Sequence, residues 1–250
     1  MAWRLAVRDI SAQYRQAALG LLWAFALPVA NALIWLFANA SGVVLIRDTE
    51  MPYPIYVFTG TMLWAIFLEA ANAPLQLTTA AKPMLAKINF PREAIIVSGI
   101  YQTLFNAAIK VVVLLPALLF LGVQPSGYLF LLPVAVMTLV FAGTAVGLFL
   151  TPVGLLYTDI GKTFPLAMQF MMYLTPVVFP IPAQGIAATI FRINPVTPLI
   201  QTARAWLTGS LGTDLVAFGL VNLGTVLVLF LMWVIYRAAM PILIEKMSAS

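Results

Sequence analysis

The sequence predicts an all-α polytopic membrane protein, and three observations support this fold class. Of the 250 residues, 63% are hydrophobic and only 8% are charged, and the mean hydropathy is +1.02. A typical soluble domain is about 25% charged and about 45–50% apolar, so a soluble fold could not cover this much apolar surface. The apolar residues also form long runs, not the alternating segments of about ten residues that build a transmembrane barrel. We therefore expect one transmembrane domain, residues 1–250, with six transmembrane helices.

Six apolar stretches are long enough to cross a bilayer, which takes about 20 helical residues. In chain order they cover residues 19–46, 53–80, 94–121, 128–156, 164–182 and 215–236. Residues 183–210 break this pattern, because they are half apolar and contain Pro195 and Pro198. We expect a hairpin of two short helices there, re-entrant from the outer side and buried against protein so that their backbone is satisfied.

Residues 1–17 are predicted to form an amphipathic helix that lies in the membrane interface without spanning it. The apolar face of this helix is formed by Trp3, Val7, Ile10 and Tyr14, and the neighbouring polar face by Arg4, Arg8, Ser11 and Arg15. Two interpretations stay open: a basic anchor that sets orientation, or a moving gate that uses Arg8, Tyr14 and Arg15. The charges also interrupt any apolar core of a cleavable signal peptide, so we expect none.

Residues 81–93 form a short basic island between two apolar runs. Lys82, Lys87 and Arg92 lie close together here, and Lys or Arg beside a membrane span marks the cytoplasmic side. Two prolines bracket residues 84–90, a stretch long enough for about two helical turns. The sequence therefore predicts a cytoplasmic loop with a short helix that a soluble partner could bind.

The basic residues at the span ends predict that both termini are cytoplasmic. A second cytoplasmic loop is expected at residues 157–162, and a short outside loop at 47–50. Nine basic residues then lie in the cytosol and three outside. The cytoplasmic ones are Arg4, Arg8, Arg15, Lys82, Lys87, Arg92, Lys162, Arg237 and Lys246, and the outer ones are Arg47, Arg192 and Arg204.

Glu69 and Lys110 are the two charged residues within the predicted spans. Charges inside a membrane are costly and usually face the bundle interior or a wet cavity. They lie on consecutive spans at similar depth, so we expect them to meet. A structural ion pair, a polar contact in a transport path and snorkelling of Lys110 all remain open.

Aromatic residues gather in the half of the spans that is predicted to face outward. They include Trp35, Phe37, Tyr53, Tyr56, Phe58, Trp64, Tyr173, Phe179, Phe191 and Trp206. The simplest interpretation is an interfacial aromatic belt. The alternative is a path lined with rings, on which the C–H faces of sugars pack, and its candidate residues are Trp35, Tyr56, Trp64, Glu69 and Lys110.

The residue types limit the chemistry that this chain can perform. There is no Cys and no His, which excludes disulfides, thiol chemistry, His-based acid–base catalysis and His-ligated metal sites. Gly161-Lys162-Thr163 lacks the earlier glycine of a nucleotide-binding P-loop, because Leu156 stands at that position. The net charge of +5 sits at span ends and does not indicate nucleic acid. We expect no catalytic residue, no metal site and no ATPase in this chain.

Several motifs, in order and at fitting spacing, together resemble one family. They are Arg8-Asp9, Gln13-Tyr-Arg-Gln16, Leu19-Gly-Leu-Leu-Trp-Ala-Phe25, Lys87-Ile-Asn-Phe-Pro-Arg-Glu93, Leu174-Thr-Pro-Val-Val-Phe-Pro180, Asn194-Pro-Val-Thr-Pro-Leu-Ile200 and Arg204-Ala-Trp-Leu-Thr-Gly209. The chain resembles the permease subunit of type-2 ABC transporters that export polysaccharides such as O-antigen lipopolysaccharide, teichoic acid and capsule.

The resemblance implies a homodimer in the bacterial inner membrane, in contact with membrane lipids and with two separate ABC ATPase subunits. ATP and Mg would be bound by those ATPases, so no cofactor is expected in this chain. The substrate would be a lipid-linked polysaccharide that passes through a channel at the homodimer interface. The residues that would couple to the ATPase are Lys87, Ile88, Asn89, Phe90, Pro91, Arg92, Glu93 and Asp159.

Two positions depart from the family pattern. Thr158 stands where the family often has Arg, and Gln201 where it often has an acidic residue. These departures affect the second cytoplasmic contact and an outer ion pair. The alternatives from other classes are an intramembrane enzyme that modifies a lipid or glycan, and an ion-coupled transporter.

Overall fold

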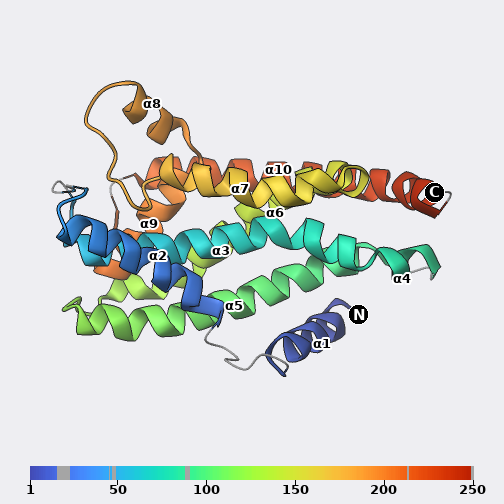
Figure 1. The fold of residues 1–250 in the computed structure, drawn as a ribbon, viewed down its shortest axis with the longest axis horizontal. Coiled ribbons are helices and arrows are strands. Elements are labelled where there is room, and N and C mark those ends of the chain that lie inside the picture. The colour runs from blue at the N-terminus through green and yellow to red at the C-terminus, as the bar shows by residue number, and fades with distance from the viewer. Residues whose placement is uncertain (16–22, 45, 47–48, 88–90, 213, 249–250) are drawn as a thin grey trace.

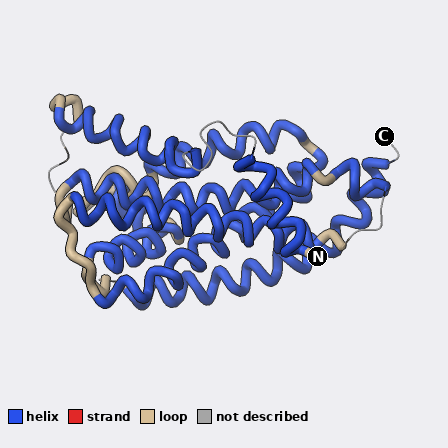
Figure 2. The backbone as a smooth tube through the Cα atoms, turned by 90° about the horizontal axis from the view of Figure 1, so that it is seen from below, coloured by secondary structure: helices blue, strands red, loops and turns tan. Residues whose placement is uncertain are grey.

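The computed structural model describes residues 1–15, 23–44, 46, 49–87, 91–212 and 214–248, and within these ranges it is helical with no strand (Figures 1 and 2). The elements are α1 (Ala2–Arg15), α2 (Trp23–Ala40), α3 (Tyr53–Ala80), α4 (Lys82–Lys87), α5 (Glu93–Phe120), η2 (Gly127–Leu131), α6 (Leu132–Leu156), α7 (Thr158–Tyr173), α8 (Ile186–Ile193), α9 (Val196–Thr208) and α10 (Leu215–Ser248). The all-helical prediction is confirmed for these residues.

Among the described residues, four helical segments are long and apolar enough to cross a membrane. They are Tyr53–Ala80, Glu93–Phe120, Gly127–Leu156 and Leu215–Leu243. Helix α2 contributes a shorter apolar stretch, Phe25–Ala40. The structure therefore confirms a multi-span helical membrane protein, and the count of six spans stays a prediction.

Helix α3 lies at the centre of the bundle and contacts α2, α5, α6, α7 and α9. Met62, Leu63 and Ile66 are fully buried on it. Its partner α6 approaches closely because Gly143 and Gly147 face the α3 backbone, where a Cβ on Gly147 would lie 2.5 Å from the carbonyl oxygen of Ala71. Large apolar side chains point outward instead on the peripheral helices, as on α10, where Phe230 is 69% exposed. In a membrane these outward side chains would contact lipid.

Four predicted boundaries are corrected by the structure. The fifth span, expected at 164–182, is wrong at both ends, because α7 begins at Thr158 and ends at Tyr173. The loop expected at 157–162 is wrong, because α7 begins at Thr158 and only Tyr157 separates it from α6. The last helix continues twelve residues past Tyr236, to Ser248, since its apolar and basic residues keep a helical pattern beyond the span. Helix α4 begins at Lys82, two residues before the expected start, because a proline is tolerated in the first turn of a helix.

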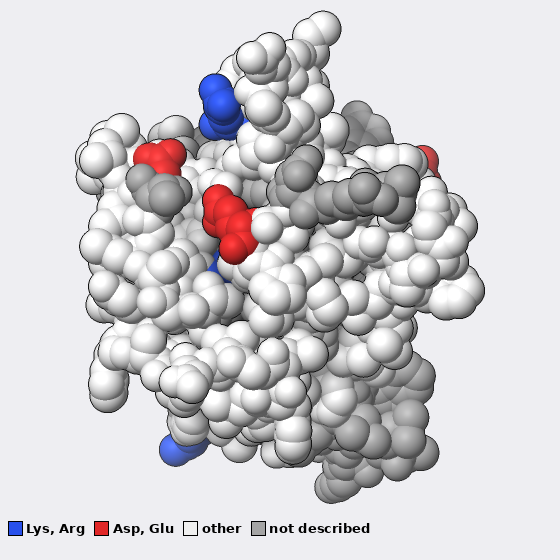
Figure 3. Space-filling model, turned by 90° about the vertical axis from the view of Figure 1, so that its left-hand side faces the viewer, with Lys and Arg blue, Asp and Glu red and all other residues white. Residues whose placement is uncertain are grey.

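The two ends of the bundle carry different elements (Figure 1). Helix α8 lies at one end, and α4 lies at the other, with both termini toward the end of α4. The expected pair of short helices between 183 and 210 is present as α8 and α9. Figure 3 views the end with α8 and shows a mostly uncharged face with a few isolated acidic and basic groups.

Candidate functional site

A polar pocket lies between helices of the bundle and is open on one side, so that Asn31, Gln76 and Gln169 of its lining are exposed. It has a volume of about 820 Å³ and lies among α1, α2, α3, α5 and α7. Its polar lining residues are Gln13, Asn31, Thr61, Glu69, Asn72, Gln76, Gln102, Thr103, Asn106, Lys110 and Gln169. The pocket between α6, α9 and α10 differs, because its volume is about 490 Å³ and Thr225 is its only hydroxyl-bearing lining residue among those described.

Helical periodicity explains why the polar residues of the pocket meet. On α5, Gln102, Asn106 and Lys110 are spaced four residues apart, which places them on one face. On α3, Glu69 and Gln76 are seven residues apart and so also share a face. These two polar stripes face one another across the pocket because each is more stable against a polar partner than against lipid.

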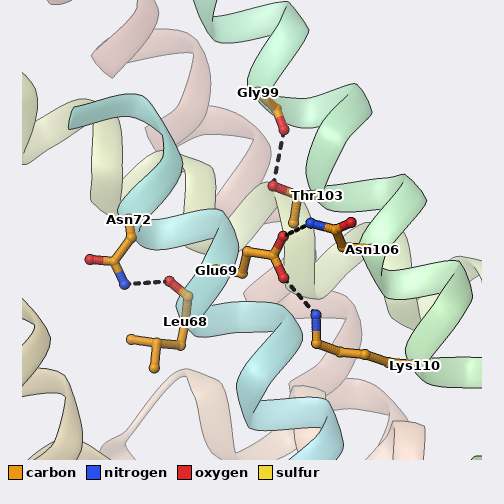
Figure 4. Close-up of polar contacts among 7 residues, drawn as sticks. All are labelled: Leu68, Glu69, Asn72, Gly99, Thr103, Asn106 and Lys110. Atoms are coloured by element: carbon orange, nitrogen blue, oxygen red, sulfur yellow. Dashed lines mark hydrogen bonds and ion pairs between the residues drawn. The ribbon is translucent and has the colours of Figure 1, made fainter. Parts of the chain in front are cut away.

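Glu69 and Lys110 form an ion pair at the centre of the site. The Nζ of Lys110 lies 2.6 Å from Oε2 of Glu69, and Asn106 Nδ2 donates a hydrogen bond to the other carboxylate oxygen. Figure 4 shows Glu69 pointing from α3 toward α5, while Asn72 points away and donates to the carbonyl oxygen of Leu68 at 2.8 Å. The Lys110 side chain is 4% exposed and that of Glu69 is 30% exposed. The predicted pairing is confirmed, and the carboxylate is the more accessible member.

Of the three aromatic residues predicted to lie along a path, only Trp64 lines this pocket. Trp35 packs edge-on against Tyr173 and Phe179, with ring centroids 5.8 and 5.2 Å apart. Tyr56 is buried and donates hydrogen bonds to the carbonyl oxygens of Pro176 and Phe179, both at 3.1 Å. Trp35 and Tyr56 therefore belong to a second cluster, built around residues 174–182, and their role in a path stays a prediction.

Arg204 holds this second cluster together. Its guanidinium is buried, donates to the carbonyl oxygens of Pro176 at 2.7 Å and Val177 at 3.2 Å, and donates to Thr59 Oγ1 at 3.2 Å. It also lies over the ring of Tyr56, 3.7 Å from the centroid. Two backbone carbonyl oxygens and the ring of Tyr56 therefore surround the guanidinium of Arg204. The sequence predicted only that Arg204 lies on the outer side, near Gln201, where the family often has an acidic residue.

The predicted coupling loop packs against the ends of two other helices. Lys82 Nζ donates to the carbonyl oxygen of Leu155 at the end of α6, at 3.1 Å, and Glu93 pairs with Arg237 of α10 at 3.4 Å. Leu85 of α4 is buried in a separate apolar cluster with Ile95, Ile96, Leu148, Leu155, Tyr236, Met240 and Leu243. The loop region is therefore joined to α6 and α10 as well as to α5.

The structure describes the predicted coupling residues only in part. Pro91 is exposed and Arg92 is half-buried, while Asp159 is exposed in the first turn of α7. Ile88, Asn89 and Phe90 lie outside the described residues, as does the side chain of Lys87. Their coupling role stays a prediction.

The predicted gate helix α1 lies along α5. Ala6 is fully buried at this contact, Trp3 meets Tyr101 edge-on with ring centroids 5.6 Å apart, and Gln102 donates to Asp9 at 3.3 Å. Arg8 pairs with Asp9 at 2.7 Å and stays exposed, and the side chains of Tyr14 and Arg15 lie outside the described residues. Helix α1 lines the pocket with Gln13, and its Asp9 accepts a hydrogen bond from Gln102, which also lines the pocket.

The amide residues of the pocket are the part of the site that the sequence interpretation missed. Asn31, Asn72, Gln76, Gln102, Asn106 and Gln169 are uncharged, so a search for intramembrane charges passes over them. The available signal was the spacing of Gln102, Asn106 and Lys110 at i, i+4 and i+8, which predicts one polar face on a span.

Comparison with known proteins agrees with this architecture. The chain is 22% identical over 204 residues, covering 80% of this chain and 77% of the relative, to an O-antigen export system permease protein of Myxococcus xanthus. It is 24% identical over 202 residues (79% and 76%) to an O-antigen export system permease protein of Klebsiella pneumoniae. It is 23% identical over 247 residues (93% and 91%) to a polysialic acid transport protein of Escherichia coli. The family model described as ABC-2 type transporter matches residues 2–208, which is most of the chain, so this protein belongs to the ABC-2 type transporter family.

Proposed function

We propose that this chain is the transmembrane subunit of an ATP-driven exporter that moves a lipid-linked polysaccharide across the inner membrane. The observation that carries the proposal is the pocket of amide side chains inside a membrane bundle. Amides both donate and accept hydrogen bonds, which suits hydroxyl-rich sugars. The printed names of the relatives, which include O-antigen export and polysialic acid transport, support a polysaccharide as the substrate, without indicating its charge.

In this proposal two copies of the chain form the channel between them, and the polar pocket contributes to its wall. Trp64 supplies a ring on which the C–H face of a sugar can pack, and Glu69 accepts hydrogen bonds from sugar hydroxyls. The bulk of the pocket lining is uncharged, so sugars can pass without strong binding at one point.

A separate pair of ATPase subunits would bind ATP and Mg and act on residues 81–93. The packing of α4 against α6 and α10 supports this role, because a push on α4 would reach three helices at once. Phe90 would insert its ring into the ATPase, while Lys87, Arg92 and Glu93 would set its orientation. Asp159, at the start of α7, would add a second contact.

The test measures glycan export in cells that lack the native gene and carry this chain with its ATPase. Asn31→Leu and Gln169→Leu remove hydrogen-bonding groups from the pocket at exposed positions on α2 and α7, so the core stays intact. We expect both variants to insert normally and to lower cell-surface polysaccharide several-fold. Gln124→Leu, the same change in an exposed loop outside the pocket, is the matched control. Wild-type export by both pocket variants would contradict the proposed path.

A further inference from the structure

We propose that the pocket among α1, α2, α3, α5 and α7 selects uncharged sugar units over acidic ones, because Lys110, the one cation among the described residues that line it, is paired with Glu69. This inference rests on the proposed function and specifies its substrate class. The charges of the lining side chains decide which sugars can exchange their hydration shell for contacts with the pocket.

The pocket has no net charge among the described residues that line it. Among the described lining residues, Glu69 and Lys110 are the two with charged side chains, and their charged atoms are 2.6 Å apart. The remaining polar groups are the amides and hydroxyls of residues such as Asn31, Gln76 and Thr61. An anionic sugar therefore finds no unpaired cation among the described residues that line the pocket.

The member of the ion pair that an anion would meet first is the negatively charged Glu69, not Lys110. The Lys110 side chain is 4% exposed, whereas that of Glu69 is 30% exposed, so Glu69 is the more accessible member of the pair. The carboxylate of a uronic or sialic acid would approach a like charge in a medium of low dielectric, where repulsion is stronger than in water. Drawing Lys110 away from Glu69 would separate a nearly buried cation from its counter-charge, which is costly.

An uncharged sugar meets the opposite situation. Its hydroxyls can donate to the remaining lone pairs of the Glu69 carboxylate and both donate to and accept from the amide groups. The hydroxyls match the polar lining without disturbing the ion pair, and Trp64 offers a ring for the apolar face of the sugar. The same lining therefore favours neutral repeat units and disfavours acidic ones.

The test varies the charge of the pocket without breaking the ion pair. Gln76 is exposed, lines the pocket on α3 and lies seven residues from Glu69, about 10 Å along the helix axis. Gln76→Lys adds one positive charge and Gln76→Glu adds one negative charge at the same position. Gln124→Lys, in the exposed loop, adds the positive charge outside the pocket.

The full chain is purified in lipid nanodiscs, and two fluorescent probes of equal length are used: a neutral dextran oligosaccharide and an oligogalacturonate. Fluorescence anisotropy at low ionic strength gives the Kd of each probe. We expect the wild type to bind dextran about tenfold more tightly than the acidic probe. Gln76→Lys should reduce this preference several-fold, Gln76→Glu should increase it, and Gln124→Lys should leave it unchanged.

The other possible results of the binding experiment would each contradict a particular part of the proposal. Equal binding of the two probes by the wild type, or a preference that both Gln76 variants leave unchanged, overturns the selectivity while the export test above can still hold. A shift with Gln124→Lys as large as that with Gln76→Lys overturns the assignment to this pocket. Binding of neither probe overturns both the selectivity and the placement of the sugar path in this pocket.

Discussion

Glu69 and Lys110 show how a membrane bundle can bury a charged group that the surrounding lipid cannot solvate. Lys110 is almost fully buried, and its stabilisation comes from the carboxylate across the gap between α3 and α5. Asn106 fixes the second carboxylate oxygen, so the geometry of the pair is set from both sides. A buried pair of this kind adds little net stability compared with apolar residues, but loss of one partner is expensive.

A double-mutant cycle tests this account of the ion pair. Glu69→Gln leaves Lys110 buried without a counter-charge, so we expect a loss of about 3 kcal/mol in the free energy of unfolding. The double change Glu69→Gln with Lys110→Met should recover most of it. Thermal unfolding of the purified protein in detergent, followed by tryptophan fluorescence, measures both. Losses that simply add would show that the two residues do not stabilise one another.

Arg204 provides the second test at the scale of single residues. Arg204→Met removes the donor from the carbonyl oxygens of Pro176 and Val177 and from Thr59, all in a buried site. Because buried acceptors without a donor are costly, we expect a loss of about 3 kcal/mol and a lower unfolding temperature. Arg192→Met changes an exposed residue on α8 in the same way and serves as the control. Equal unfolding temperatures for the two variants would refute this role.

At the scale of elements, the contact between α3 and α6 depends on glycine. Gly143 and Gly147 lie one turn apart on α6, and a Cβ at either would overlap the backbone or side chains of α3 at residues 67–74. Without these side chains the two helices pack at close range, as small residues permit in membrane helices. The same contact fixes the position of Glu69 on α3, opposite α5.

Gly147→Ala should weaken the contact between α3 and α6. The new Cβ would lie 2.5 Å from the carbonyl oxygen of Ala71 and 2.7 Å from Pro74, so the helices must separate. We expect destabilisation of about 1–3 kcal/mol, seen as a lower unfolding temperature. Gly224→Ala on α10 is the matched control, because no atom lies within 4 Å of its added Cβ and alanine favours the helix. If Gly224→Ala destabilised the protein and Gly147→Ala did not, the contact between α3 and α6 would not depend on glycine.

At the scale of the whole molecule, the charge distribution and the arrangement of the ends agree. The basic loop at 81–93 and the two termini were expected on the same side, and the structure places both termini toward the end that carries α4 (Figure 1). Which side of the membrane that end faces stays a prediction from the positive charges.

Cysteine labelling decides the orientation. The chain has no native Cys, so single cysteines report without interference. Glu50→Cys introduces an exposed thiol in the loop after α2, Ser126→Cys a half-buried one in the loop after α5, and Pro91→Cys an exposed one beside α4. A membrane-impermeant thiol reagent added to intact cells should label positions 50 and 126 and leave position 91 unlabelled until the cells are opened. The reverse pattern would invert the topology.

The sequence alone determined the properties that depend on neighbours along the chain. Hydropathy fixed the membrane class, and the span at 53–80 matches α3 at both ends, because apolar length and helix breakers are local signals. The two intramembrane charges were few enough to predict their pairing. The motifs at 87–93 and 174–209 identified the family, which the match over residues 2–208 then confirmed.

Only the tertiary structure decided which helices share a site. The pocket takes residues from five helices, and no local pattern states that Asn31, Gln102 and Gln169 face one cavity. Nor could the sequence place Arg204 among the carbonyls of residues 176 and 177, because that contact depends on how α9 packs against α3. Periodicity gives each helix a polar face, whereas the glycine contacts and the ion pair determine which faces meet.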